Sequence, residues 1–151
     1  MGLFDAIDAS GSGLQAERLR MDVTSENLAN AQTTKGADGR PYRRKDVVLQ
    51  EAGDVGSSFA SVLSSAQGRG LNGTTAHGVK VAGIVEDPSP SRRVYDPGHP
   101  DADAKGYVSM PNVNTVTEMT DLIGASRAYE ANVTAMQTTK AMFARTLDIL
   151  K

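Results

Sequence analysis

The last third of the chain carries large apolar residues at a spacing of seven. One series consists of Leu122, Tyr129, Met136, Phe143 and Leu150, and a second series on the neighbouring ridge consists of Met119, Val133 and Leu147. A seven-residue repeat sustained over about four heptads is typical of a helix in a coiled coil or a helix bundle. Packing of the helix on its own domain is the simpler alternative, because the pattern alone does not identify the partner.

Helix-start signals stand just before this repeat. Thr115 and Glu118 have the spacing of a capping box, and Asn114 is a competing N-cap. No proline follows before Lys151, and only Gly124 weakens the helix. We therefore expect one helix from Thr115 to the end of the sequence, roughly 50 Å long at about 1.5 Å per residue.

The N-terminal segment has two apolar stripes. Ile7, Leu14, Met21 and Leu28 are spaced by seven, and Ala16, Leu19 and Val23 lie on roughly the opposite face. A helix with two apolar stripes needs partners on both sides. The run Ser10-Gly11-Ser12-Gly13 interrupts the pattern, so we expect the main helix to start at Ser12, after a short leading segment, and to end near Asn30.

The middle of the chain favours short strands. We expect strands at 42–49, 79–85 and 107–108, and a strand at 93–95 that returns onto 79–85 as a hairpin. Residues 52–78 are rich in Gly, Ser and Ala and are expected to form a flexible insertion. The expected fold is mainly α with a small β-rich middle. Residues 1–35 and 112–151 would form a discontinuous helical core, and 36–111 the middle segment.

Composition narrows the class of protein. Aromatic residues make up only 5% of the 151 residues and Trp is absent, which predicts a thin core. A formal charge of -2 argues against a nucleic-acid partner. Absence of Cys excludes disulfides and thiolate metal sites. No run approaches the roughly 18–20 apolar residues that cross a bilayer, and the N-terminus lacks the features of a cleaved signal peptide.

One cluster of polar residues resembles a cation site. Asp96, His99, Asp101 and Asp103 are close in sequence, but their spacing matches no calcium loop, and Pro97, Gly98 and Pro100 suit a rigid polar turn. Two His and no Cys supply no nucleophile–base pair, and no phosphate-binding loop is present. We expect no enzymatic activity, no cofactor and no metal. The run Arg43-Arg44-Lys45 is either a solvated face or a contact in an assembly.

Several motifs resemble those of flagellar rod and hook proteins. The run Asn27-Leu28-Ala29-Asn30 with Thr33 resembles the N-terminal signature of that wide family. Further stretches resemble its proximal-rod members, and the residues that carry this resemblance are Asn27, Ala29, Asn30, Thr33, Pro41, Tyr42, Arg43, Arg44, Tyr95, Asp96, Pro97, Gly98, His99, Pro100, Asp101, Asp103, Asn112, Asn114 and Arg127. One small departure is Thr34, where many relatives carry Pro.

The resemblance implies a structural subunit of the proximal rod of the flagellar basal body. Such a subunit assembles with itself and with other rod proteins into the tube that transmits torque from motor to hook and forms part of the export channel. Basal-body ring components and the type III export apparatus are the further partners implied. The location implied is the periplasm-spanning rod, reached without a cleaved signal peptide and without insertion into the membrane.

The resemblance and the stripes together assign the assembly interface to helical seams. The seam residues are Ile7, Leu14, Leu19, Met21, Val23, Leu28, Met119, Leu122, Tyr129, Val133, Met136, Phe143, Leu147 and Leu150. The alternatives are another axial component of the rod and hook family, a metal-binding periplasmic protein that uses Asp96 to Asp103, and a coiled-coil adaptor that forms a small closed oligomer.

Overall fold

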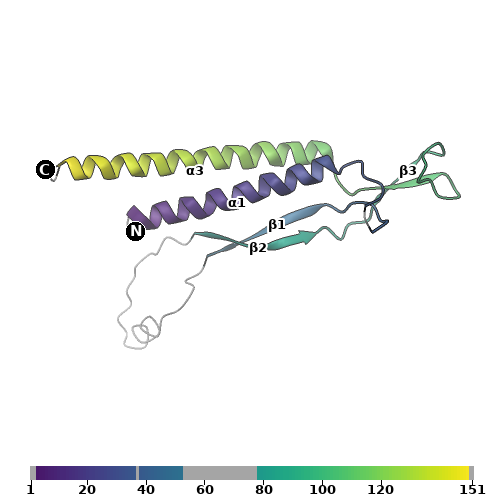
Figure 1. The fold of residues 1–151 in the computed structure, drawn as a ribbon, viewed down its shortest axis with the longest axis horizontal. Helices are drawn as coiled ribbons and strands as arrows, with labels where there is room; N and C mark the ends of the chain where they lie inside the picture. Colours follow the sequence, from purple (N-terminus) through teal and green to yellow (C-terminus); the bar gives the residue numbers. More distant parts are fainter. Residues whose placement is uncertain (1–2, 37, 53–77, 150–151) are drawn as a thin grey trace, which may run out of the picture. The chain divides into compact units, whose positions relative to one another are not determined.

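In chain order, one long helix precedes four short strands and a second long helix follows them (Figure 1). The computed structural model describes residues 3–36, 38–52 and 78–149. In chain order the elements are α1 (Leu3–Ala29), β1 (Lys45–Glu51), β2 (Val79–Glu86), β3 (Arg92–Tyr95), β4 (Tyr107–Met110) and α3 (Thr115–Ile149). The expectation of a mainly α chain with a β-containing middle is confirmed. The coiled-coil geometry stays a prediction, and the expected insertion at 52–78 lies almost wholly outside the described residues.

The chain divides into two compact units. Unit 1 contains 1–16, 49–81 and 129–151, and unit 2 contains 17–48 and 82–128. Each unit therefore includes a segment of α1 and a segment of α3. The predicted division into a terminal helical core and a middle segment remains a prediction.

Helix α1 runs without a break through the run of Ser and Gly, so the expected helix start at Ser12 is wrong. The Ser12 hydroxyl donates to the Ala9 carbonyl at 2.8 Å and accepts from the Val79 amide at 3.0 Å. A Cβ at Gly13 would lie 3.1 Å from Nδ2 of Asn132. The glycines of this segment therefore bring α1 close to its neighbours in unit 1, at the cost of helix propensity.

Helix α3 begins at Thr115 as expected, and Asn114 is its N-cap. The Asn114 Oδ1 accepts a hydrogen bond from the amide of Val116 at 3.1 Å. Its carbonyl accepts the first helical bond, from the amide of Glu118 at 3.0 Å. The Glu118 carboxylate is bound elsewhere, so the alternative Thr115–Glu118 capping box is not formed.

The strands form two separate two-stranded sheets, one of β1 and β2 and one of β3 and β4. The expected hairpin between 79–85 and 93–95 is therefore wrong. Strand β3 pairs antiparallel with β4, so that Val94 faces Val108 and Tyr95 faces Tyr107. The amide of Asp87, just after β2, donates instead to the Arg44 carbonyl at 2.8 Å. Strand pairing depends on where distant segments meet, which local spacing does not reveal.

Small side chains make up the buried core. Among the residues that the structure describes, the buried apolar ones in unit 2 are Val23, Ala31, Val47, Val108, Pro111, Val113 and Ala125, and the buried one in unit 1 is Ala16. None of these is aromatic or a leucine, in agreement with the thin core that the composition predicts. Polar contacts must therefore help to fix the positions of the helices in unit 2.

Two helical glycines form a matched pair for a stability test. A Cβ at Gly124 meets nothing within 4 Å, whereas one at Gly13 is crowded. We expect Gly124→Leu to leave the free energy of unfolding unchanged or to raise it by up to about 1 kcal/mol. We expect Gly13→Leu to lower it by about 1–3 kcal/mol, because the Asn132 side chain must move to admit the larger residue. Urea denaturation followed by circular dichroism measures both, and equal effects would contradict the close approach at Gly13.

Candidate assembly site

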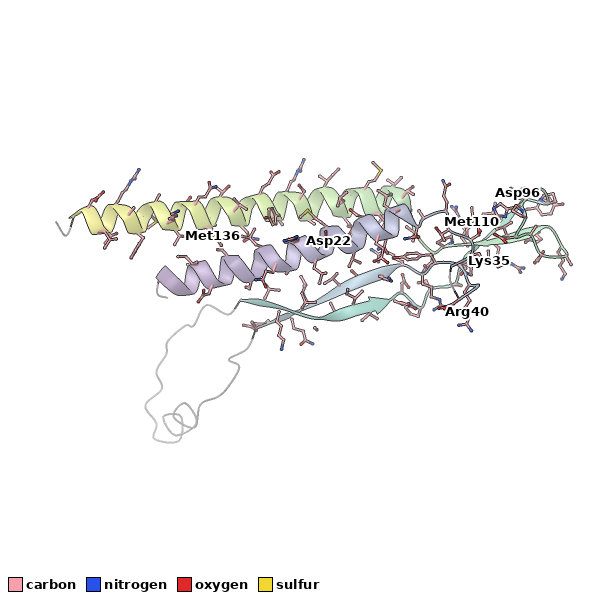
Figure 2. The ribbon with its side chains drawn as sticks, viewed as in Figure 1. Asp22, Lys35, Arg40, Asp96, Met110 and Met136 are labelled. Atoms are coloured by element: carbon pink, nitrogen blue, oxygen red, sulfur yellow. The ribbon has the colours of Figure 1, made fainter. Side chains whose placement is uncertain are left out.

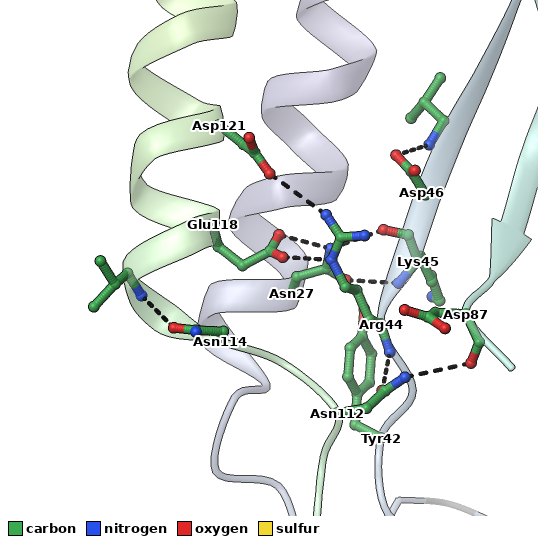
Figure 3. Close-up of polar contacts among 12 residues, drawn as sticks. Asn27, Tyr42, Arg44, Lys45, Asp46, Asp87, Asn112, Asn114, Glu118 and Asp121 are labelled. Carbon is green, nitrogen blue, oxygen red and sulfur yellow. Dashed lines mark hydrogen bonds and ion pairs between the residues drawn. The ribbon is translucent and has the colours of Figure 1, made fainter. Parts of the chain in front are cut away.

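The side chain of Asn27 lies at a buried polar junction in unit 2 (Figure 3). Only 1% of Asn27 is exposed. Its Nδ2 donates to the Lys45 carbonyl at 2.8 Å and to Oε2 of Glu118 at 3.0 Å. Its Oδ1 accepts from the Tyr42 hydroxyl and from the Lys45 amide, both at 2.9 Å. Two donors and two acceptor positions are all that an amide side chain offers, so Asn27 is fully satisfied.

The second member of the junction is the ion pair of Glu118 and Arg44. Glu118 is 1% exposed, and its Oε1 accepts from Nε of Arg44 at 2.6 Å. Nη2 of Arg44 also lies 3.4 Å from Oδ2 of Asp121 on the next turn of α3. A buried carboxylate is tolerated only when it is paired and hydrogen-bonded, and Glu118 has both kinds of partner.

The extended segment before β1 explains how these side chains converge. Successive side chains of an extended backbone point to opposite sides. Tyr42 and Arg44 therefore both point toward the helices, while Arg43 between them points outward and is exposed. Asn112 fixes the segment from the other side, because its Oδ1 accepts from the Arg44 amide at 2.8 Å.

The junction shifts two pKa values. The hydrogen bond to Glu118 raises the pKa of Arg44, so its guanidinium stays charged at every physiological pH. Burial raises the pKa of Tyr42, and the nearby Glu26 raises it further. The Tyr42 hydroxyl therefore remains a neutral donor to Asn27. Across the described residues, no buried side-chain nitrogen or oxygen lacks a hydrogen-bond partner.

Three of the candidate cation ligands, Asp96, His99 and Asp103, accept hydrogen bonds from backbone amides of the segment between β3 and β4, whereas the Asp101 carboxylate binds Thr34 and Lys35 outside it. Asp96 Oδ1 accepts from the Gly98 amide at 3.1 Å, and His99 Nδ1 accepts from the Asp101 amide at 3.1 Å. Asp103 Oδ1 binds two backbone amides of the turn. Within the described ranges, no group of three or more His, Cys, Asp or Glu is placed to hold a metal ion. The arrangement supports the rigid polar turn that was the simpler interpretation.

The predicted seam residues differ widely in exposure. Val23 is buried, while Met119, Phe143 and Leu147 are exposed. Those of intermediate exposure are Ile7, Leu14, Leu19, Met21, Leu28, Leu122, Tyr129, Val133 and Met136. Leu150 lies outside the described residues. Their role in an interface remains a prediction, because the structure contains a single chain.

The helix α3 exposes further apolar residues that the seven-residue pattern did not include, namely Val116, Ile123 and Met142. The structural roles of Asn27 and Glu118 were also missed. A buried polar residue has no signature in its own neighbourhood of the sequence, since its partners lie 15 to 91 residues away. None of the described helices has the length and hydropathy needed to cross a membrane.

Comparison with known proteins identifies the class. Residues 7–37 match the family described as "Flagella basal body rod protein", and residues 104–149 match the family described as "Flagellar basal body rod FlgEFG protein C-terminal". The first match contains Asn27, and the second contains Glu118. Asn27 and Glu118, the two buried polar residues of the junction, thus fall in segments characteristic of proteins of the flagellar basal-body rod.

Relatives that align along their whole length narrow the class further. The flagellar basal-body rod protein FlgC of Bacillus subtilis is 49% identical, and the alignment covers 100% of both chains. FlgC of Borreliella burgdorferi is 44% identical over 100% of this chain and 99% of its own, and FlgC of Yersinia enterocolitica is 43% identical over 99% and 98%. The chain belongs to the FlgC family of flagellar basal-body rod proteins.

The ion pair of the junction generates a stability prediction. We expect Arg44→Ala to lower the free energy of unfolding by about 3 kcal/mol or more, because it leaves the buried Glu118 carboxylate unpaired. The matched control is Arg43→Ala, which removes the adjacent exposed arginine and should change stability by less than about 0.5 kcal/mol. Urea denaturation of the purified chains measures the difference. Similar losses in both variants would show that the junction does not stabilise unit 2.

The turn before β4 generates a prediction about pH. Hydrogen bonds from the amides of Tyr107 and Lys105 hold the pKa of Asp103 below its ordinary value of 3.8. A carboxyl group with a lowered pKa stabilises the fold above its unfolded-state pKa, and this contribution disappears as the pH falls through the folded-state value. We expect the stability difference between the parent chain and Asp103→Asn to be constant near neutral pH and to shrink below pH 3.8. Thermal unfolding across an acid series tests this, and a difference that grows on acidification would reverse the assignment.

Proposed function

We propose that this chain is a structural subunit of the proximal part of the flagellar rod and that it has no enzymatic activity. The observation that carries the proposal is the similarity to FlgC proteins along the whole chain. The subunit would bind neighbouring copies and other rod proteins through its helices, and the resulting tube would transmit torque from motor to hook. It would also form part of the export channel.

Exposed apolar residues on α3 support assembly through helices. Six large apolar side chains of this helix are exposed: Val116, Met119, Ile123, Met142, Phe143 and Leu147. Burying such a side chain fully contributes about 1.5–3 kcal/mol. Three of the six, Met119, Phe143 and Leu147, belong to the predicted seam, and apolar surface of this kind favours burial in an interface. The predicted seams on α1 and α3 would then be completed by neighbouring subunits.

The further partners and the location belong to the same proposal. The basal-body rings and the type III export apparatus are the partners expected of a subunit that is exported and then assembled in the periplasm. Export without a cleaved signal peptide is part of the same proposal.

Deletion of the chain from its source bacterium tests the function. We expect cells without it to be non-motile and to contain basal bodies that lack a rod and hook, as seen by electron cryotomography. Re-expression of the intact chain from a plasmid should restore both. Intact flagella in the deletion strain would overturn the proposal.

The seam assignment predicts that Leu147→Asp blocks assembly without unfolding the chain. Leu147 is already 50% exposed in the single chain, so the free energy of unfolding should change by less than about 0.5 kcal/mol. Assembly would bury the new carboxylate in a seam without a partner, which is costly, so the number of complete rods should fall by about tenfold or more.

A matched control for this variant is Thr138→Asp. Thr138 is exposed and lies about 180° from Leu147 around α3, at about 100° per residue. It receives the same carboxylate on the other face of the helix and should leave assembly intact. Rod counts by electron microscopy of purified basal bodies compare the two variants. Normal rods with Leu147→Asp would remove that residue from the interface.

A further inference from the structure

An exposed aromatic surface lies at the end of the β3–β4 hairpin in unit 2. Tyr95 is 64% exposed although its ring is held in place. Its ring centroid lies 5.3 Å from that of Tyr107 in an edge-to-face arrangement, and the Arg93 guanidinium lies 5.4 Å from the Tyr107 centroid. Exposed Tyr residues that are rigidly supported are favoured at the energetic centres of protein interfaces.

Gly106 is what allows the Tyr95 ring to lie against the turn. A Cβ at Gly106 would be 2.9 Å from Cε2 of Tyr95, closer than real side chains approach. Gly106 also has a φ of +78°, a conformation that costs other residues free energy. One side of the ring therefore packs on the backbone of the turn, and the rest of it faces solvent. The surface is preorganised, so little side-chain entropy would be lost when a partner binds.

The carboxylate next to the Tyr95 ring, that of Asp96, forms no ion pair within the described residues. Arg93 binds Asp103 at 2.8 Å, and Lys35 lies 3.7 Å from Asp101. Asp96 is exposed, accepts only a backbone hydrogen bond from Gly98, and forms no ion pair with any residue that the structure describes. An aromatic ring next to an unpaired carboxylate favours a cationic partner, and a guanidinium suits it best because it can stack and donate at once.

A guanidinium of this kind is exposed elsewhere on the same unit. Arg43 points away from the junction that holds its neighbours Tyr42 and Arg44, and it makes no ion pair within the described part of the chain. It lines an open cavity of about 420 Å³ whose other charged residues are the cations Arg40 and Lys45 and the carboxylates Asp38 and Glu86. Figure 2 shows Arg40 in the loop before β1 and Asp96 at the end of the hairpin, so the two surfaces are separate.

We propose that Tyr95 and Asp96 of one copy of this chain bind Arg43 of the next copy. The contact is heterologous, because each copy uses one patch to bind a different patch of its neighbour. Such contacts build rings or open helical filaments. This inference rests on the proposed function, since a rod is an open helical assembly, and it assigns to that assembly a contact outside the helical seams. The opposite charges of Asp96 and Arg43, both exposed on the same chain, favour a second copy as the occupant.

Charge reversal tests the contact in cells that lack the chromosomal copy. Asp96→Arg and Arg43→Asp each place like charges opposite each other, and we expect each to lower the number of rods per cell by about tenfold. The variant that carries both substitutions restores opposite charges at every contact and should return to within about threefold of the parent. Asp96→Asn, which keeps the hydrogen bond to Gly98, should give an intermediate loss.

A cysteine pair tests whether the partner is a second copy. The chain contains no Cys, so introduced thiols are the only ones it has. Two tagged forms, Tyr95→Cys and Arg43→Cys, are expressed in the same cell, and isolated basal bodies are treated with a bismaleimide crosslinker. A crosslink between the two tags is expected, because the spacer of the reagent spans the distance that the Tyr ring and the Arg side chain filled, whereas a disulfide would need Cβ atoms within about 4.5 Å. Thr117→Cys, at an exposed position of α3, replaces Arg43→Cys as the control and should give no crosslink.

The outcomes separate this contact from the function itself. If both charge reversals assemble normally while the deletion strain has no rods, the contact is wrong and the rod function stands. If each reversal blocks assembly, the combined variant does not recover and no crosslink forms, the surfaces bind a different protein and the second copy is excluded. Rescue together with the crosslink establishes the contact. The free energy of unfolding of each purified variant must match that of the parent chain, as expected for substitutions of exposed residues.

Discussion

The four hydrogen bonds of the Asn27 side chain fix the relation of three separate segments in unit 2. Its amide binds the backbone of Lys45, the hydroxyl of Tyr42 and the carboxylate of Glu118. A buried amide that loses a partner costs about 1–3 kcal/mol, so none of the three segments can shift alone. The apolar core beside it consists mainly of valines and alanines, which slide more easily than large interlocking side chains. Polar geometry therefore determines the arrangement where packing cannot.

This junction also decides which side chains are available to partners. By turning Tyr42 and Arg44 inward it turns Arg43 outward, because the backbone between them is extended. In the same way, the turn at Gly106 holds Tyr95 against the hairpin and leaves much of its ring exposed. A member of the FlgC family thus combines apolar helix surfaces with a few rigidly held polar and aromatic groups. Apolar helix surfaces suit extensive helical packing, and in interfaces generally the rigidly held charged groups favour specific partners.

Sequence reasoning succeeded where the signal is local and failed where it is not. The two candidate N-caps Asn114 and Thr115 placed the start of α3 to within one residue, and the absence of proline after them correctly predicted a long helix, which spans 35 residues. The glycines before Leu14 were interpreted as a break, whereas they mark a close approach between helices, and both situations call for glycine. Strand β3 was expected to pair with β2 because the two are neighbours in sequence. It pairs with β4 instead.

The sequence by itself determined the helices, the presence of strands, the turn residues and the family, because each depends on neighbouring residues or on short motifs. Only the tertiary structure decided what Glu118 does. At its position in the first turn of α3 it could cap the helix, face solvent or bind a distant cation, and all three are compatible with the same local pattern. In the structure the Glu118 carboxylate binds the guanidinium of Arg44, which lies 74 residues earlier in the chain. A contact between residues so far apart exists only once the chain has brought them together, and the free energy that selects it comes from burial and pairing rather than from local propensity.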